Sequence, residues 1–247
     1  MKVLATYNIK GSVGKTATAV NLAYLAAEGG TRTLVWDLDP QGAASFYFRV
    51  KPRVKGGAEA IIGGRRALDR AIKGTDYDNL DLMPADFSYR NMDLDLDGTR
   101  KPTRRIDLLL RPLARDYDYT FLDCPPSISL VSENVFRAAD ALLVPLIPTT
   151  LSMRTLAQLD AFLADQSPKR RPRILAFFSM VDQRKTLHRE LIEKVRAERS
   201  DVLDTQIPAT SDIERMGVHR APLASYAPRA RSAAAYRELW AEVVDRL

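Results

Sequence analysis

The chain has 247 residues, 46% of them hydrophobic, which fits one α/β domain over residues 1–247, or a domain with a small subdomain. A formal net charge of +6 and a pI near 9.5 permit a polyanionic partner without requiring one. No run of about 18 apolar residues is present, and Met1-Lys2 leads directly into an apolar stretch. We therefore expect neither a membrane span nor a signal peptide, and a cytoplasmic location. The single cysteine, Cys124, excludes an internal disulfide and a cysteine-held zinc or iron–sulfur centre.

The first predicted elements are an apolar strand over 3–7 and a helix that begins near Lys15, joined by a glycine-containing loop. Gly11 and Gly14 let the backbone turn tightly and approach a ligand closely. The free N–H groups at the helix start, together with the helix dipole, favour an anion there. Lys15 is placed to reach the β- and γ-phosphates of a nucleotide, and the Thr16 hydroxyl to ligate Mg²⁺. This stretch therefore predicts a phosphate-binding site.

A second strand is predicted over 33–37, and its uninterrupted apolar run is typical of a parallel strand covered on both faces. Pro40 and Gly42 end the strand, so that Asp37 and Asp39 project from its carboxyl end. In α/β sheets, ligands bind at the carboxyl ends of the strands. We therefore expect both carboxylates beside the phosphate loop, with Asp37 orienting the outer shell of the metal.

The stretch from 45 to 75 is punctuated by glycines and predicts short helices, and a short strand is expected over 80–84. The acidic run 93–98 resembles the first half of a calcium-binding loop. Its twelfth position, however, would be Arg104, where such a loop needs a glutamate. We therefore expect a solvated acidic loop at 93–98.

A helix predicted over 104–115 leads to an apolar strand over 119–123, which ends in Asp123. An aspartate in this position is typical of the second half of a P-loop ATPase site, where it holds Mg²⁺, here through water. Cys124 follows directly. Because neither histidine of the chain lies near it in sequence, we interpret Cys124 as a packed thiol and not as a nucleophile.

The rest of the chain continues to alternate strands and helices, which predicts a doubly wound sheet with helices on both faces. A final helix over 232–246 places Leu239, Val243 and Val244 on one apolar face, which we assign to the sheet. A membrane-seeking helix is the alternative, but anionic lipid would repel the acidic residues on its polar face. The other predicted elements are strands over 141–146 and 173–180 and a helix over 151–164.

Ile9 stands where the usual P-loop has its first glycine, and a second lysine, Lys10, follows it. Lys10-Gly11-x-Val13-Gly14-Lys15-Thr16 resembles the deviant P-loop of the ParA/MinD family of dimeric ATPases. Ser12 replaces the family's usual glycine, and its β-carbon is tolerable if φ stays negative. The segments Asp123-Cys124-Pro125-Pro126-Ser127, Met180-x-Asp182-x-Arg184 and Ile207-Pro208 also resemble this family. The resemblance covers essentially the whole chain and is closest to small ParA proteins without an N-terminal DNA-reading domain.

This resemblance implies the P-loop NTPase fold, with a mostly parallel sheet of seven or eight strands, and ATP and Mg²⁺ as cofactors. It implies that Lys10 crosses to the nucleotide of a partner subunit, so that ATP holds a homodimer together and hydrolysis releases it. Asp39 would orient the attacking water, with a turn or helix-cap role before Pro40 as the alternative. The implied nucleotide-binding residues are Lys10, Gly11, Ser12, Val13, Gly14, Lys15, Thr16, Ala17, Met180, Asp182 and Pro208. The implied catalytic residues are Lys10, Lys15 and Asp39, and the implied metal residues are Thr16, Asp37 and Asp123.

The resemblance further implies an ATPase that partitions or positions DNA or another cargo on the nucleoid, stimulated by a ParB-like adaptor protein. Its ATP-bound dimer would bind duplex DNA without sequence preference, which requires basic residues spread over one surface. Candidates in the C-terminal third include Lys169 and Arg170. Arg184, Arg215 and Arg220 are the preferred DNA contacts. A solvated basic surface without a DNA partner is the alternative interpretation.

Two other functional classes remain open from the sequence. A membrane-cycling regulator of the MinD kind is one, although the acidic face of the last helix leads us to expect no stable membrane association. The other is a nucleotide-gated interaction protein in which Ser12 has blunted turnover.

Overall fold

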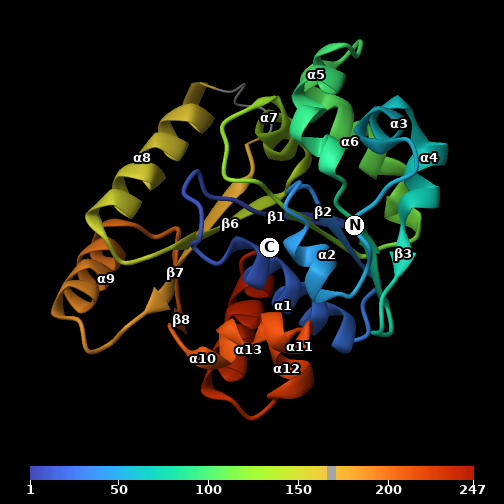
Figure 1. Ribbon diagram of the computed structural model, residues 1–247. Coiled ribbons are helices and arrows are strands. Elements are labelled where there is room, and N and C mark those ends of the chain that lie inside the picture. Colours follow the sequence, from blue (N-terminus) through green and yellow to red (C-terminus); the bar gives the residue numbers. More distant parts are fainter. Residues whose placement is uncertain (166–170) are drawn as a thin grey trace.

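The computed structural model describes residues 1–165 and 171–247, which form an eight-stranded sheet in the order β3-β4-β2-β5-β1-β6-β7-β8 (Figure 1). Every pairing among these strands is parallel except that of β3 with β4. The mostly parallel, doubly wound sheet expected from the sequence is confirmed. The strands are β1 (Lys2–Thr6), β2 (Thr33–Asp37), β3 (Lys73–Gly74), β4 (Leu80–Met83), β5 (Tyr119–Asp123), β6 (Ala141–Leu146), β7 (Arg173–Val181) and β8 (Val202–Pro208).

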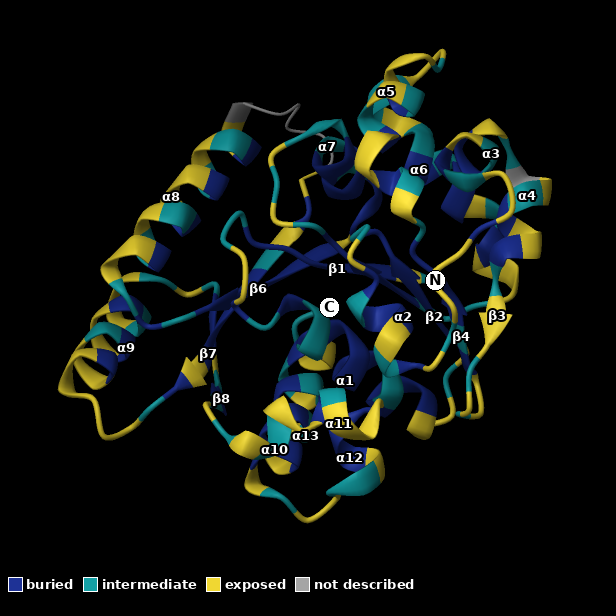
Figure 2. Ribbon diagram, viewed as in Figure 1, coloured by how far each residue is buried: buried dark blue, intermediate teal, exposed yellow. Residues whose placement is uncertain are grey.

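Helices cover both faces of the sheet, and each face has its own buried apolar cluster. The central strands are dark throughout in Figure 2, whereas the outer sides of the helices are exposed. One face carries α1 (Lys15–Glu28), α2 (Ala43–Tyr47), α10 (Ser211–Glu214), α11 (Met216–His219), α12 (Leu223–Tyr226) and α13 (Arg231–Asp245). The other carries α3 (Gly57–Gly63), α4 (Arg65–Ala71), α5 (Met92–Asp97), α6 (Arg105–Leu110), α7 (Leu130–Ala138), α8 (Thr150–Asp165) and α9 (Thr186–Glu198).

The strands predicted from uninterrupted apolar runs are confirmed, because β2, β5 and β6 have the predicted bounds. All residues of β2 and β6 are buried, as two-sided coverage by helices requires. The short helices expected between residues 45 and 75 are also confirmed, as α2, α3 and α4.

The prediction of an acidic loop at 93–98 is wrong, because this stretch lies largely in the helix α5 (Met92–Asp97). Met92 and Leu96, four residues apart, are fully buried on one face, while Leu94 between them is 75% exposed. A helix is the conformation that puts residues at this spacing on the same side. The buried pair therefore decides the structure; Asp97 is exposed, Asp95 is half buried, and Asp93 accepts a hydrogen bond from the Val131 N–H at 2.8 Å.

The helix expected over 104–115 is divided into α6 and a 3₁₀ helix, Arg111–Arg115. Pro112 lies at the start of the 3₁₀ segment, and a proline has no N–H to continue the α-helical hydrogen bonds. The proline therefore explains why the α-helix ends at Leu110.

The last helix, α13, packs on the sheet as expected. The Trp240 ring lies 5.2 Å from that of Tyr119 and 5.8 Å from that of Phe121, between ring centroids. Leu239 and Val243 are fully buried, but Val244 is 43% exposed, so its assignment to the buried face is wrong. Val244 directly follows Val243, and adjacent helical residues point about 100° apart. Among the described residues, no helix is long and apolar enough to cross a membrane.

A carboxylate on α13 also satisfies backbone groups of the edge strand β8. Glu242 accepts hydrogen bonds from the N–H groups of Asp204 (2.7 Å) and Thr205 (2.9 Å) and from the Thr205 hydroxyl (2.8 Å). Unpaired N–H groups on an edge strand invite pairing with another chain. Glu242 therefore fastens the C-terminal helix to the sheet and covers part of its edge.

We expect Glu242→Ala to lower the free energy of unfolding by about 1–3 kcal/mol, because the partly buried Thr205 N–H and hydroxyl lose their acceptor. Urea denaturation measures the change. Glu238→Ala, one turn earlier on the same helix at an exposed position, is the matched control and should change stability by less than about 0.5 kcal/mol. Equal losses in both variants would contradict the assigned role of Glu242.

Candidate nucleotide and metal site

The loop between β1 and α1 is held in place by a side chain that the sequence analysis did not single out. The Asn8 amide donates to the Pro145 carbonyl at 2.8 Å, and its oxygen accepts from the Lys10 N–H at 2.9 Å. Asn8 thereby joins the loop to β6. Lys15 Nζ donates to the carbonyl of Lys10 at 3.2 Å, so the lysine amine lies over its own loop. The loop is thus preformed around the end of a lysine side chain.

Gly14 is required at the start of α1 for two reasons. Its φ is 96°, in the left-handed region that favours glycine, and it is the N-cap of the helix. A β-carbon at Gly14 would also lie 2.9 Å from the Ser179 hydroxyl oxygen on β7. The phosphate loop therefore packs tightly against the carboxyl end of β7.

Ser12 adopts φ 57°, so the condition under which its β-carbon would be tolerable does not hold. The left-handed region costs a non-glycine residue roughly 1–2 kcal/mol. This explains physically why glycine suits the position, and Ser12 holds local strain within the phosphate loop.

Asp37 and Asp123 lie side by side at the carboxyl ends of β2 and β5. Their Cα atoms are partners in the parallel register of the two strands, and both residues are fully buried. Asp37 Oδ1 and Asp123 Oδ2 have no hydrogen-bond partner among the described residues. The structure thus brings together the two carboxylates that the sequence placed at separate strand ends, each with one oxygen available.

Burial raises the pKa of both carboxyl groups. For Asp123, the negative charge of Asp37 adds to the effect of burial, and nearby hydroxyls of Thr16 and Thr6 oppose it. For Asp37, hydrogen bonds from Ser45 oppose the burial. Burial also lowers the pKa of Lys15, against the attraction of Asp123. The site therefore holds opposite charges at close range, and the two carboxylates destabilise each other.

Two hydroxyl residues orient these carboxylates, and the sequence analysis named neither. Ser45, at the middle of α2, donates to Asp37 Oδ2 through both its N–H and its hydroxyl, each at 2.8 Å. Thr6 on β1 donates to Asp123 Oδ1 at 3.2 Å. Both contacts depend on tertiary structure, because Ser45 follows Asp37 by eight residues and Thr6 precedes Asp123 by 117.

The arrangement fits a hard divalent cation. Two buried carboxylate oxygens without partners, with Thr16 close to Asp123, supply the oxygen ligands that Mg²⁺ prefers. No group of three or more His, Cys, Asp or Glu residues that could hold a metal occurs within the described ranges. Mg²⁺ commonly takes only one or two carboxylates and completes its shell with water and substrate phosphates, so this sparse donor set suits Mg²⁺ better than zinc.

Cys124, next to Asp123, is 2% exposed, and burial raises the pKa of its thiol well above its usual value. A thiol that stays protonated is a poor nucleophile. The interpretation of Cys124 as a packed thiol is confirmed.

Asp39 lies beyond β2, half buried, and its carboxylate accepts a hydrogen bond from the Gln41 N–H at 3.0 Å. This is the turn contact that the sequence analysis kept as the alternative to a catalytic role. Asp39 is also close enough to influence the pKa of Asp37, Asp123 and Lys15. Its position beside the site therefore suits either role.

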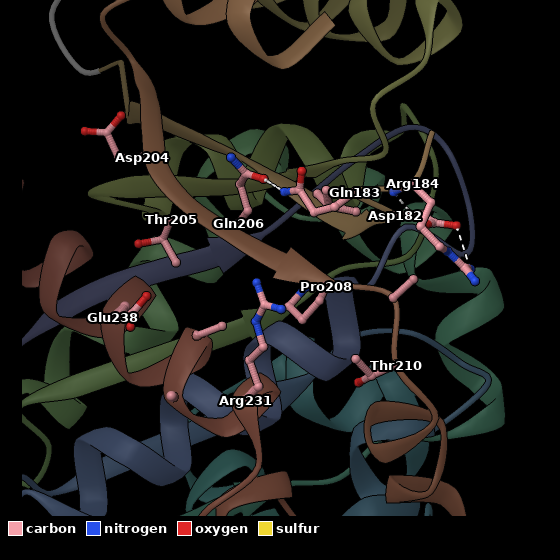
Figure 3. A pocket seen from close by; sticks show the side chains of 14 residues that line it. Asp182, Gln183, Arg184, Asp204, Thr205, Gln206, Pro208, Thr210, Arg231 and Glu238 are labelled. Atoms are coloured by element: carbon pink, nitrogen blue, oxygen red, sulfur yellow. Dashed lines mark hydrogen bonds and ion pairs between the residues drawn. The ribbon is translucent and has the colours of Figure 1, made fainter. Parts of the chain in front are cut away.

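Two of the three residues expected on the adenine side come together in a pocket of about 630 Å³ (Figure 3). Asp182 and Pro208 line this pocket, where the ends of β7 and β8 meet the start of α13. Met180 lies just before it on β7, 43% exposed, with φ 55°. In Figure 3 the Arg231 guanidinium extends toward Pro208, a cation that the sequence analysis missed.

The three preferred DNA contacts are exposed, on the loop after β7 and around α11. Arg184, whose side chain is 91% exposed, pairs with Asp182 and holds the pKa of that carboxyl at about 2. Arg215 is the C-cap of α10, and Arg220 the C-cap of α11. The other candidates Lys169 and Arg170 lie outside the described residues.

A strand, a phosphate loop and a helix, beside an aspartate at the end of a neighbouring strand, define a P-loop nucleotide hydrolase.

Residues 1–174 match a family model described as AAA domain. The chain is 32% identical over 247 residues to the sporulation initiation inhibitor protein Soj of Bacillus subtilis, covering 98% of each chain. It is 31% identical over 254 residues to the chromosome partitioning protein ParA of Caulobacter vibrioides, covering 100% of this chain and 95% of the relative. The chain belongs to this AAA domain family and, within it, to the small ParA-like proteins of the ParA/MinD family of ATPases.

A solved structure adds a ligand-bound relative. The cobyrinic acid a,c-diamide synthase of Mycobacterium smegmatis, with bound ADP and magnesium, superposes with a TM-score of 0.82 at 27% identity, covering 99% of this chain and 94% of that one. A putative plasmid partition protein of Borrelia burgdorferi bound to AMPPNP has a TM-score of 0.86 at 20% identity and covers 100% and 99%. The second likeness concerns the fold alone.

Without ligand, we expect Asp123→Asn to stabilise the protein at about pH 8, by about 1–3 kcal/mol, because the neutral amide removes a buried charge beside Asp37. A carboxyl pKa that is raised by folding means that the ionised form destabilises the folded state. The gain should therefore shrink as the pH falls and Asp123 becomes protonated in the parent. Thermal unfolding of the parent and the variant, at about pH 8 and at successively lower pH, measures this difference in stability.

Asp118→Asn, just before the start of the same strand β5, is the control of opposite sign. Hydrogen bonds from Arg32 lower the pKa of Asp118 to about 2, so its ionised form is the favourable one. Stabilisation by both substitutions, or by neither, would contradict the electrostatic reading of Asp123.

Proposed function

We propose that the protein is a Mg²⁺-dependent ATPase that dimerises around ATP and partitions or positions DNA or another cargo. The observation that carries the enzymatic part is the pair of buried carboxylates, Asp37 and Asp123, each with an oxygen that has no partner among the described residues. A pair of this kind destabilises the free protein and gains from a divalent cation. The magnesium and ADP bound by the mycobacterial structural relative support the choice of cofactors.

In this proposal, the phosphate loop binds the nucleotide through its backbone N–H groups and Lys15. The lysine amine exchanges its contact with the Lys10 carbonyl for the β- and γ-phosphates. Thr16 and Asp123 would hold Mg²⁺, Asp123 through water, and Asp37 would orient the outer shell of the metal, whose charge would neutralise that of the phosphates. Asp39 orients the water that attacks the terminal phosphate, and loses nothing of its turn contact if one oxygen stays on Gln41. Asp182, Pro208 and Met180 border the adenine.

The proposal of a dimer is based on Lys10, the second lysine of the phosphate loop. Its N–H donates to Asn8, which fixes the start of the side chain, and its amine makes no hydrogen bond or ion pair within the part of the chain that the structure describes. A charge supplied in trans stabilises phosphoryl transfer in other nucleotide hydrolases. ATP would therefore hold two subunits together, and hydrolysis would separate them.

The chromosome partitioning role of the Caulobacter relative supports duplex DNA as the surface on which this cycle runs. The ATP-bound dimer would bind DNA without sequence preference through exposed arginines such as Arg184, Arg215 and Arg220, and a ParB-like adaptor would stimulate hydrolysis. A protein with these interactions would act in the cytoplasm, on the nucleoid. The sign of the net charge, +6, is the one that this surface requires.

Asp39→Ala should leave binding of ATP and Mg²⁺ intact but stall hydrolysis, because the variant loses the group that orients water while keeping all proposed phosphate and metal contacts. The stalled complex should accumulate as a dimer in size-exclusion chromatography with ATP. Lys15→Ala is the control: it loses the cation at the phosphates and should neither bind ATP in calorimetry nor dimerise. An Asp39→Ala variant that binds ATP and stays monomeric would refute the dimer mechanism.

The parent with ATP should bind duplex DNA with an affinity that falls as salt rises, the logarithmic slope being about 0.9 per phosphate contacted. Arg215→Ala should flatten the slope equally for unrelated sequences, by about 2 units if each subunit of the dimer loses one contact. Lys10→Ala should also weaken DNA binding, through loss of the dimer. Arg66→Ala, at an exposed position on α4 across the sheet, removes the same charge and should leave the slope unchanged. If Lys10→Ala binds DNA like the parent, ATP-dependent dimerisation does not control DNA binding.

A further inference from the structure

Two arginines end helices in a backbone conformation that usually requires glycine. Arg49, directly after the C-cap of α2, has φ 59°, and Arg220, the C-cap of α11, has φ 48°. Helices often end on a residue in this left-handed conformation, and a side chain there carries a penalty of roughly 1–2 kcal/mol. Arginine at both positions therefore indicates that the side chain makes a contact that glycine could not make.

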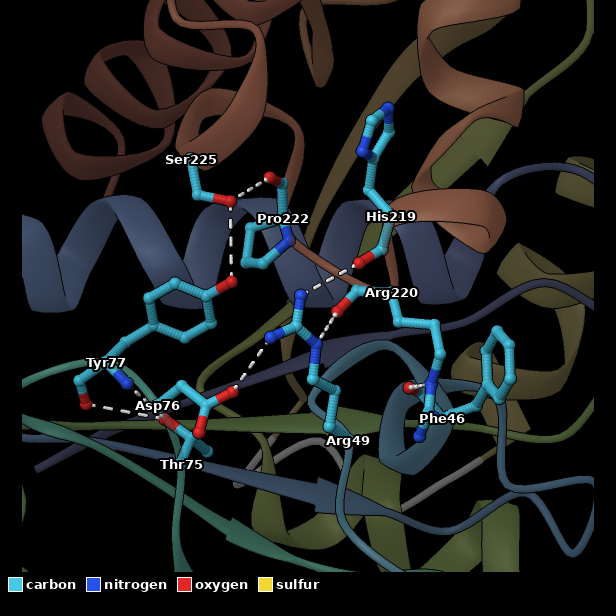
Figure 4. A network of polar contacts seen from close by, with 9 residues as sticks. All are labelled: Phe46, Arg49, Thr75, Asp76, Tyr77, His219, Arg220, Pro222 and Ser225. Carbon is cyan, nitrogen blue, oxygen red and sulfur yellow. Dashed lines mark hydrogen bonds and ion pairs between the residues drawn. The ribbon is translucent and has the colours of Figure 1, made fainter.

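The two guanidinium groups bind the ends of each other's helices (Figure 4). Arg49 donates from Nε to the Arg220 carbonyl at 3.1 Å and from Nη2 to the His219 carbonyl at 3.0 Å. Arg220 donates from Nε to the Phe46 carbonyl at 3.2 Å, and its guanidinium lies 4.7 Å from the centroid of the Phe46 ring. Each arginine thus satisfies C-terminal carbonyls of the opposite helix, where a cation is also favoured by the helix dipole.

The end of α2 is closed by a regular hydrogen-bond pattern as well. The Arg49 N–H donates to the Phe46 carbonyl at 3.1 Å, and the Val50 N–H to the Ser45 carbonyl at 3.0 Å. These are the two bonds of a Schellman motif. The Phe46 carbonyl therefore accepts from both arginines, one through the backbone and one through the side chain. A helix of five residues has little stability of its own, so the burial of Ala44 and Phe48 and these end contacts together determine where it lies.

The position of α2 matters because Ser45, the residue before Phe46, orients Asp37. Its N–H and hydroxyl both bind Asp37 Oδ2, and the hydroxyl accepts from the Ala85 N–H at 2.9 Å. With Oδ2 occupied in this way, Oδ1 is the oxygen that has no hydrogen-bond partner in ranges 1–165 and 171–247. Ser45 therefore selects which oxygen of Asp37 is available, and both arginines bind the carbonyl of the next residue, Phe46.

Two further contacts lie beside this pair, and one of them reaches the C-terminal third. Arg49 pairs with Asp76 at 3.4 Å, and the Tyr77 and Ser225 hydroxyls lie 3.4 Å apart. Both contacts are largely exposed, and exposed ion pairs contribute little to stability. The three hydrogen bonds from the arginines to helix-end carbonyls are exposed as well, but each has a charged donor and satisfies a backbone carbonyl, so they form the larger part of the network in Figure 4.

We propose that Arg49 and Arg220 are positioning residues for the Asp37 carboxylate. By binding each other's helix ends they hold α2, and α2 holds Asp37 through Ser45 in the orientation that receives the metal. The inference rests on the proposed function, which assigns Asp37 to Mg²⁺. It adds that two arginines at the molecular surface, one of them from the C-terminal third, set the affinity of the metal site.

Arg49→Gly and Arg220→Gly test the proposal, because glycine suits the left-handed backbone and removes only the guanidinium. The measurement is the Mg²⁺ concentration that half-saturates the protein in calorimetry with a non-hydrolysable ATP analogue. Loss of a residue that orients a metal ligand typically weakens metal binding about 10-fold to 100-fold, and these arginines act one step further away, so we expect an increase of about 3-fold to 10-fold. Binding of the analogue without Mg²⁺ should be unchanged. A general structural defect would instead weaken binding of the analogue with and without Mg²⁺.

Ser45→Ala should shift the Mg²⁺ dependence in the same direction by about 10-fold, since it removes the direct contact to Asp37. The double variant Arg49→Gly with Arg220→Gly should shift it no further than the larger single effect, because the two arginines act as one unit. Arg32→Gly is the matched control: it breaks an exposed arginine contact to Asp118 at the opposite end of the sheet and should change nothing.

The outcomes separate this inference from the proposed function. If the parent does not bind the analogue with Mg²⁺, the proposed function is overturned and the inference with it. If the parent binds and Ser45→Ala shifts the Mg²⁺ dependence, but neither glycine variant does, the positioning role of the arginines alone is overturned. Shifts that also occur in Arg32→Gly would likewise overturn it.

Discussion

The structure depends on two carboxyl groups that are buried side by side and repel each other when both are ionised. Asp37 and Asp123 are register partners on adjacent strands, fully buried, and burial raises the pKa of both. Burying an ionised carboxylate without a counter-ion is among the most unfavourable events in folding. The sheet therefore supplies the free energy that keeps the pair in place, while Ser45, Thr6 and Lys15 reduce the repulsion only in part. The same repulsion would be relieved by a bound cation. The pair therefore lowers the stability of the free protein and at the same time favours binding of a metal.

How far the sequence predicts this site depends on the range of the interactions involved. Asp37 and Asp123 could be placed because uninterrupted apolar runs predict parallel strands, and parallel strands bring their carboxyl ends to one edge. The phosphate loop could be predicted equally well, because its strand, glycines and helix are consecutive in the sequence. Ser45 could not be found, because its contact to Asp37 depends on where a five-residue helix packs. The same holds for α5, where the buried pair Met92 and Leu96 outweighs an acidic sequence that favours a loop.

Backbone conformation explains a second group of features that sequence patterns conceal. Five described residues other than glycine have positive φ; Ser12, Arg49, Met180 and Arg220 lie in or beside the site or its supporting contacts, and the fifth, Asn79, directly precedes β4. Strain of this kind persists only where the surroundings over-determine the conformation, and it gathers at functional sites. At Arg49 and Arg220 the compensation is visible as hydrogen bonds to helix-end carbonyls. The phosphate loop around Ser12 is instead anchored through Asn8, two residues before Lys10, which fixes the loop from its other end.

The exposed arginines show why a basic surface cannot be converted directly into a nucleic-acid interface. Arg184 is almost fully exposed, yet it is paired with Asp182 at the rim of the pocket between β7 and β8. Arg220 is exposed and engaged with Phe46. For either residue, a phosphate contact would replace an existing contact, so the free energy gained is the difference between the two and not the full value of a new charge pair. Exposed pairs contribute little, so Arg184 loses little by exchange. Arg220 would give up a hydrogen bond to a helix-end carbonyl and a stacked ring, and is the costlier of the two to redirect.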